Sequence, residues 1–276
     1  MRTHGNKKHL IMLLIFVFVL LSILPLFYMV KLSLENSASL FSSSGWNNFG
    51  LGNYVKVLKD PNFMRAYLNS LLVSLITVTV GILVNSSAGF ALAKMNFRSK
   101  KFFFFMILVS FMVPIEATVI SLRFVVDKLR LVDTYLGLIL PMLGNGMCIF
   151  LFKSHFEEID DEFMDAARMD GASWLDIYVK IALPMAKGTI AACALVLFLS
   201  QWNILFWPLI AANSDKFQTL QMYIVSQISY ERTNWGAMLA ASILSSVLPV
   251  FSFFCLQGSF KRSLSGILHF LRRRKI

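Results

Sequence analysis

The segment 153–187 holds residues whose types and spacing suit a specific binding interaction. Eight of the chain's 15 acidic residues lie there, within a pattern that predicts two short helices. Acidic side chains crowd the start of the first helix, where they suit the positive end of a helix dipole. Phe163, Ala166 and Ala167 then follow at spacings i, i+3 and i+4, which predicts one small, apolar helix face.

A hinge separates the two predicted helices. Gly171 is expected to end the first helix, because glycine readily turns the chain at a helix C-terminus. Ser173 and Asp176 have the spacing of a capping box for the second helix, which Pro184 is expected to close. Small side chains beside a hinge would let another protein approach closely. The alternative is a solvated, charged loop that merely joins its neighbours.

Polar side chains inside apolar runs form a second candidate group, because a polar group in lipid is costly unless it has a partner. Most of the serines and threonines there are expected to bond between helices. Glu116 follows Pro114, where a helix would be weakened, and fits either a solute pathway or a structural ion pair. Trp202, Asn203, Phe206 and Trp207 combine aromatic faces with an amide late in an apolar run, and an interfacial aromatic belt is the alternative. Asn85 and Asn145 are further polar candidates.

Six apolar stretches must position these residues. The chain has 276 residues, of which 57% are hydrophobic and only 15% charged, and its mean hydropathy is +0.67. This composition excludes an ordinary soluble enzyme, a disordered chain and a small disulfide-stapled domain. The stretches are long enough, or nearly so, to cross a bilayer as helices, and they cover residues 10–30, 68–92, 102–124, 136–152, 189–210 and 235–256. We therefore expect an all-α, polytopic membrane protein with six transmembrane helices.

The basic residues predict the orientation of these spans. If the N-terminus is cytoplasmic, 17 of the 26 Lys and Arg residues lie on the cytoplasmic side. Because such residues accumulate in cytoplasmic loops, we expect both termini and segment 153–187 inside the cell, in a plasma-membrane protein. Residues 1–9 would form the N-terminus, 10–256 the membrane domain and 257–276 a basic tail able to meet anionic lipid. The net charge of +11 is better explained by this bias than by nucleic-acid binding.

Two strings in segment 153–187 resemble a known motif. Residues 165–171 read Asp-Ala-Ala-Arg-Met-Asp-Gly, and after nine residues the string Ile181-Ala182-Leu183-Pro184 follows. Their spacing resembles the EAA motif of ABC importer permeases, E-A-A-x3-G-x9-I-x-L-P, with aspartate in place of the glutamate. Asn69-Ser70-Leu71, Met112-Val113-Pro114 and Trp202-Asn203 look like the maltose-type sugar permeases, and the resemblance covers about residues 53–265.

The resemblance implies the fold and partners of a type I ABC importer permease. A second permease subunit would complete the pathway, two ATP-binding subunits would supply energy, and an extracytoplasmic solute-binding protein would deliver a sugar or oligosaccharide. The motif would couple to the ATPase through Asp165, Ala166, Ala167, Asp170, Gly171, Ile181, Leu183 and Pro184. The sequence of the tail differs from the tails of this family, so the resemblance does not predict a contact between the tail and the ATPase.

Catalytic motifs are absent from the sequence. It contains no G-x-x-x-x-G-K-[ST] phosphate loop, no H-E-x-x-H and no G-x-S-x-G. No cofactor, metal or enzymatic activity is therefore expected, and ATP hydrolysis would belong to a partner subunit. The alternatives are an ABC permease for another solute, such as a polyamine or phosphonate, and a membrane-embedded scaffold or enzyme.

Overall fold

The computed structural model describes residues 3–35, 49–228 and 234–273, and every regular element in these ranges is helical. This confirms the predicted all-α class. The longer elements are α1 (Thr3–Leu34), α2 (Gly52–Lys59), α3 (Pro61–Lys94), α4 (Lys100–Met112), α5 (Ile115–Lys128), α7 (Gly146–Glu157), α8 (Asp161–Met169), α11 (Lys187–Asn203) and α14 (Trp235–Arg273). The shorter ones are α6 (Tyr135–Ile139), η1 (Leu140–Met142), α9 (Trp174–Ile177), η2 (Tyr178–Ala182), α10 (Leu183–Met185), α12 (Phe206–Ala211), η3 (Asp215–Phe217) and α13 (Leu220–Ser226).

Three of the described helices are long and apolar enough to cross a membrane without a break, namely Ile11–Leu34, Pro61–Lys94 and Trp235–Cys255. Three more candidates are pairs of helices that are bent at a short break, so the described residues hold up to six spans. The predicted multi-pass helical architecture is confirmed, although half of its candidate spans are not straight rods. The helix α14 also runs unbroken to Arg273, through most of the predicted tail.

Proline explains the sharpest break. The helices α4 and α5 meet at an angle of 110°, within the predicted third span at 102–124. Pro114 lacks the N–H that would continue the helical ladder, and it forces the preceding residue toward extended backbone. Val113 accordingly has φ −85° and ψ 119°. The sequence that was expected to form one straight span is therefore bent sharply in its middle.

The predicted span at 189–210 is not one helix either. The helix α11 ends at Asn203, Ile204 is extended, and α12 begins at Phe206. Pro208 accounts for this break. Proline has no N–H to donate to the carbonyl of Ile204, four residues earlier, and its ring clashes with that carbonyl. The predicted span at 136–152 likewise consists of α6, η1 and α7, whose two halves meet at 46°.

Two compact units make up the chain. The first comprises Met1–Met64 and Tyr223–Ser246. Within it the amide of Asn53 in α2 donates to the carbonyls of Ser33 and Glu35, each over 2.9 Å. The hydroxyl of Tyr223 donates to the carboxylate of Asp60 over 2.7 Å. Burial and this carboxylate raise the pKa of Tyr223.

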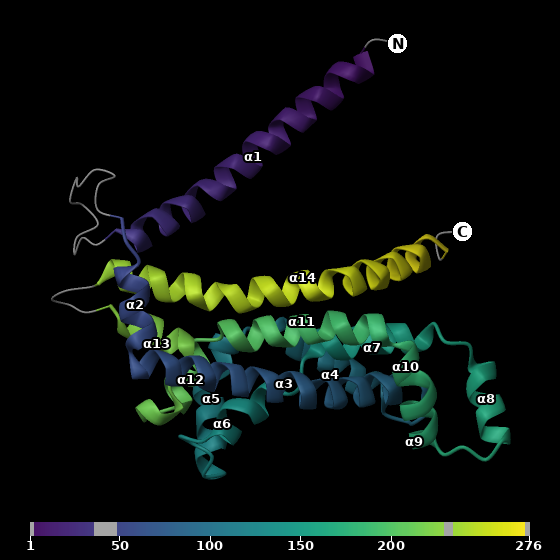
Figure 1. Cartoon of the computed structure of the whole chain (residues 1–276). Coiled ribbons are helices and arrows are strands. Elements are labelled where there is room, and N and C mark those ends of the chain that lie inside the picture. The colour runs from purple at the N-terminus through teal and green to yellow at the C-terminus, as the bar shows by residue number, and fades with distance from the viewer. Residues whose placement is uncertain (1–2, 36–48, 229–233, 274–276) are drawn as a thin grey trace. The chain divides into compact units, whose positions relative to one another are not determined.

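The second unit, Arg65–Met222 with Val247–Ile276, carries both sites described below. Its α3, α4, α7 and α11 run side by side (Figure 1). Gly89 allows α3 to approach α7, because a Cβ there would lie 2.6 Å from the Cβ of Phe152. One apolar core surrounds Phe152, Phe156 and Ile177, and another surrounds Leu138 and Trp207.

Candidate functional site

A cavity of about 690 Å³ opens at the bend between α4 and α5. Residues of α3, α4, α5, η1 and α11 line it, so every candidate span of the second unit except α14 contributes. Its polar lining consists of Thr77, Ser110, Glu116, Thr118, Asn145, Ser200, Gln201 and Asn203. A cavity of this size could accommodate a small oligosaccharide or a comparable solute.

Two buried polar atoms in this lining have no hydrogen-bond partner among the described residues. They are Oγ1 of Thr77, whose residue is 1% exposed, and Oε1 of Gln201, whose residue is 6% exposed. Leaving a buried polar group unsatisfied costs about 1–3 kcal/mol. Both residues line the cavity, while these two atoms are themselves closed to solvent in this structure.

Three of the six residues predicted for the pathway line this cavity, namely Glu116, Asn145 and Asn203. Asn145 also caps α7, because its Oδ1 accepts from the N–H of Cys148 over 3.0 Å. Asn203 donates to the carbonyl of Leu199 over 2.9 Å. Glu116 forms no hydrogen bond or ion pair in the described part of the chain, which leaves its carboxylate available to the cavity.

Asn85 lies outside the lining and holds the helix break together. Its amide nitrogen donates to the carbonyls of Leu143 and Gly81, over 2.8 and 2.6 Å. Its Oδ1 accepts from the N–H of Asn145 over 2.7 Å. The side chain is fully buried, so it satisfies backbone groups that the break between η1 and α7 would otherwise leave free.

The predicted aromatic residues also lie outside the lining. Trp202 is buried, and its ring stacks on Phe198 at 5.5 Å and meets Tyr67 edge-on at 5.5 Å. Phe206 begins α12 and is exposed. The structure thus brings together half of the predicted pathway residues. The assignment of a pathway to all six stays a prediction.

The segment between α7 and α11 forms the predicted pair of short helices. The α7 helix continues to Glu157, so the loop is shorter than the predicted 153–187. The helix α8 then ends in a Schellman motif, in which the N–H of Ala172 donates to the carbonyl of Ala167 and that of Gly171 to Arg168, each over 3.0 Å. Gly171 has φ +85°, as the sequence predicted for the hinge.

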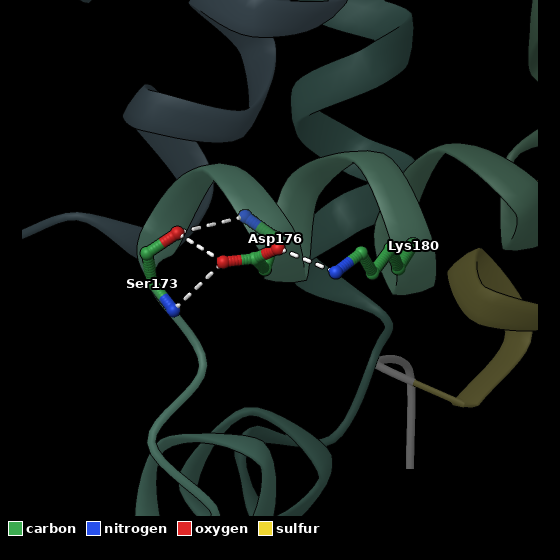
Figure 2. A network of polar contacts seen from close by, with 3 residues as sticks. All are labelled: Ser173, Asp176 and Lys180. Carbon is green, nitrogen blue, oxygen red and sulfur yellow. Dashed lines mark hydrogen bonds and ion pairs between the residues drawn. The ribbon is translucent and has the colours of Figure 1, made fainter.

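The second helix begins with the predicted capping box (Figure 2). The N–H of Asp176 donates to Oγ of Ser173 over 3.1 Å, and the N–H of Ser173 donates to the Asp176 carboxylate over 3.2 Å. Lys180 donates to the same carboxylate over 2.6 Å. The hydrogen bond from Lys180, followed by those from Ser173, lowers the pKa of Asp176 to about 2.

The second loop helix is fixed to the membrane helices by its buried face. Ile177 and Tyr178 pack in the core with Phe90, Phe152 and Phe156. The hydroxyl of Tyr178 lies 2.7 Å from that of Ser86 on α3. The helix ends at Met185, one residue beyond Pro184, and the turn preceding the proline is a π-helix. Movement of this helix would therefore act directly on α3 and α7.

The loop exposes three large apolar side chains. Met169 is 88% exposed, Leu175 69% and Phe163 57%. Of the residues assigned to the coupling motif, Asp165, Ala166, Asp170, Gly171 and Pro184 are exposed, and Ala167, Ile181 and Leu183 are half-buried. The residues assigned to coupling thus provide the hinge and the half-buried side chains. Other residues of the loop provide the exposed apolar side chains.

Several of these residues were not selected from the sequence. Thr77 and Gln201 were visible there only as two among many polar residues in apolar stretches, and nothing in their spacing shows that they converge. Met169 and Leu175 are apolar residues at positions of the motif where its pattern specifies no residue type. Exposure is what distinguishes them from core residues, and exposure follows from the tertiary packing.

Comparison with known proteins agrees with this architecture. Residues 77–266 match the family described as "Binding-protein-dependent transport system inner membrane component". The arabinooligosaccharides transport system permease protein of Halalkalibacterium halodurans is 31% identical over 85% of this chain and 78% of its own length. The sn-glycerol-3-phosphate transport system permease protein of Salmonella paratyphi A is 33% identical over 77% of this chain and 76% of its own.

A solved structure shares the fold. It is that of a bacterial ABC transporter involved in the import of the acidic polysaccharide alginate, which superposes with a TM-score of 0.82 at 24% identity. The match covers 94% of this chain and 98% of that one. The family match spans more than half of the chain, and the relatives cover most of its length. The chain therefore belongs to the binding-protein-dependent transport system inner membrane components, the permease subunits of ABC importers.

Proposed function

We propose that this permease carries a sugar or oligosaccharide and that the cavity at the α4–α5 bend is part of the route. The relatives named for arabinooligosaccharides and sn-glycerol-3-phosphate support a solute with hydroxyl groups. The cavity combines amide, hydroxyl and carboxylate groups with apolar walls, which is the mixture that recognises sugar hydroxyls and ring faces. The single observation that carries the proposal is the lining of this cavity, in which one carboxylate joins several amides and hydroxyls among apolar residues.

The loop helices are proposed to dock on an ATP-binding subunit. The exposed apolar side chains of Phe163, Met169 and Leu175 provide a surface whose burial would be favourable. Ile177 and Tyr178 connect the same segment to the spans. The assembled transporter would contain a second permease subunit, two ATP-binding subunits and an extracytoplasmic solute-binding protein. ATP hydrolysis would occur in the ATP-binding subunits.

The distribution of the basic residues supports an orientation of the chain in the membrane. Both termini and the loop between α7 and α11 are proposed to be cytoplasmic, which places 17 of the 26 basic residues inside. A single cysteine at Glu158, in a chain without the native cysteines, should resist an impermeant thiol reagent in intact cells. Rapid labelling there would contradict this orientation.

Reconstitution tests the transport proposal. The chain should be purified with its second permease, its ATP-binding subunits and its binding protein, and uptake of neutral oligosaccharides into proteoliposomes should be measured. Gln201→Leu and Thr77→Val should each reduce uptake, because they remove the unpaired acceptor and the unpaired hydroxyl. Ser87→Ala is the matched control, since the hydroxyl of Ser87 is exposed and bonds within α3. Uptake of polyamines or phosphonates without sugar uptake would overturn the solute class.

A further inference from the structure

The charge of the cavity distinguishes between solutes that family membership leaves open. Relatives are named for sn-glycerol-3-phosphate, an anion, and for arabinooligosaccharides, which are neutral. The described lining of this cavity contains one charged side chain, that of Glu116, and no Lys, Arg or His. An anionic solute would therefore meet a negative charge with no cation beside it.

The remaining polar groups of the lining are uncharged hydroxyls and amides. Such groups can both donate to and accept from sugar hydroxyls, whereas the Glu116 carboxylate can only accept. Binding of an anion ordinarily relies on Arg, Lys or several N–H donors.

The nearest cation along α5 does not offset this charge. Arg123 lies seven residues after Glu116, about 10 Å along the helix axis. Its guanidinium donates to the carbonyl of Ile210, and the residue is not part of the cavity lining. A polyamine is also a poor match, because one carboxylate cannot balance several positive charges.

We infer that Glu116 makes this half of the pathway selective against anions, and that the importer carries uncharged, polyhydroxylated solutes rather than phosphorylated or acidic ones. This inference rests on the proposed route through the cavity. Because Glu116 forms no hydrogen bond or ion pair with another described residue, Glu116→Gln removes the charge without breaking a described bond.

Charged thiol reagents measure the sign of the potential directly. In the assembled importer, Cys148→Ala, Cys193→Ala and Cys255→Ser would remove the native thiols, and Ser200→Cys would place a reporter in the cavity wall. The reagents are trimethylammonium-ethyl and sulfonato-ethyl methanethiosulfonate, which carry opposite charges. We expect the ratio of cationic to anionic labelling rates to fall about fivefold with Glu116→Gln, as for one unit charge acting across a partly solvated cavity.

Two controls make the result specific. Met169→Cys, on the exposed surface of the loop, should show a ratio that is unaffected by Glu116→Gln. Glu116→Lys should reverse the preference at Ser200→Cys. An unchanged ratio in Glu116→Gln would overturn the inference. The inference would also be overturned if neither Ser200→Cys nor Asn203→Cys reacted with the reagents, since the cavity would then be closed to solutes.

Protection of the reporter identifies the class of solute. Arabinotriose, trigalacturonate and spermidine would be added before labelling of Ser200→Cys, as neutral, anionic and cationic probes. We expect arabinotriose to protect the reporter from labelling and trigalacturonate not to protect it. In the Glu116→Lys variant, trigalacturonate should protect the reporter as well. Protection by trigalacturonate in the unaltered cavity would overturn the inference. Protection by spermidine alone, with the predicted labelling ratio, would instead overturn the proposed sugar transport.

Discussion

The ammonium of Lys94, the last residue of α3, lies 2.6 Å from the carboxylate of Asp161, the first residue of α8. The same ammonium donates to the carbonyl of Ile159. The Lys94 side chain is only 6% exposed, whereas that of Asp161 is 80% exposed. This hydrogen bond from Lys94 lowers the pKa of Asp161. One side chain thus fastens the start of the loop to the helix that carries Thr77 and Asn85.

Lys94→Met should weaken the coupling of the loop to α3. Methionine keeps the apolar stem packed but removes the charged donor to Ile159, a bond to a charged group worth about 1.5–3 kcal/mol. We expect the variant to insert and assemble normally, while solute-stimulated ATP hydrolysis and uptake fall. The measurements are solute-stimulated ATP hydrolysis and solute uptake, made on the same proteoliposomes.

Lys180→Met is the control for this change. Lys180 also pairs with a carboxylate of the loop, that of Asp176, but its side chain is 73% exposed and the pair lies within one helix. Such a pair contributes little. Equal losses of coupling in the two variants would show that loop charge matters and that the connection to α3 does not.

The hinge at Gly171 should depend on backbone conformation more than on space. Among the described residues, none other than its chain neighbours lies within 4 Å of the place a Cβ would take, but φ is +85°. We expect Gly171→Ala to reduce copurification of the ATP-binding subunits, because alanine in a left-handed conformation costs about 1–2 kcal/mol. Gly171→Asn should retain more of the ATP-binding subunits, since asparagine tolerates the left-handed conformation better than alanine does. Equal copurification in both variants would mean that the hinge conformation is not required.

The exposed apolar surface of the loop gives a separate prediction. Leu175→Asp should abolish docking of the ATP-binding subunit, because a carboxylate would be buried without a partner. Leu175→Met keeps the apolar character and similar volume, so it should preserve docking. Affinity capture of the assembled complex distinguishes the two variants. Capture of a complete complex by the Leu175→Asp protein would show that this surface is not the docking site.

The sequence predicted the hinge and the capping box because both depend on local spacing. Gly171 and the Ser173–Asp176 pair work within one or two turns of chain, so their types and positions suffice to identify them. The cavity is different, since Thr77 and Gln201 meet only after α3 and α11 pack in the same unit. Helical periodicity also cannot show that Pro114 and Pro208 break two predicted spans, because prolines are tolerated inside many membrane helices.

Asn85→Leu should destabilise the second unit. The substitution is close in volume, but it leaves the carbonyl of Leu143 and the N–H of Asn145 without their partner in an apolar setting. The expected cost is about 2–6 kcal/mol, at 1–3 kcal/mol for each of the two buried groups. Thermal unfolding of the detergent-purified chain should begin at a lower temperature, whereas Ser87→Ala, on an exposed face of α3, should leave it unchanged. An unaltered melting temperature would mean that water replaces the amide.

The Asp176 cap should persist well below neutral pH. Its pKa is lowered from 3.8 to about 2, so the carboxylate stabilises the second loop helix fully above about pH 4. That contribution is lost as the pH falls through about 2, because protonation then removes the acceptor for Lys180 and Ser173. Titration of the Asp176 carboxyl by carbon NMR in the labelled protein, assigned with Asp176→Asn, measures this directly. Lys180→Met should move the midpoint upward toward 3.8, since the hydrogen bond from Lys180 is the largest cause of the shift. A midpoint near 3.8 in the unaltered chain would show that the carboxylate is solvated and that the capping contacts are not maintained in the membrane-inserted protein.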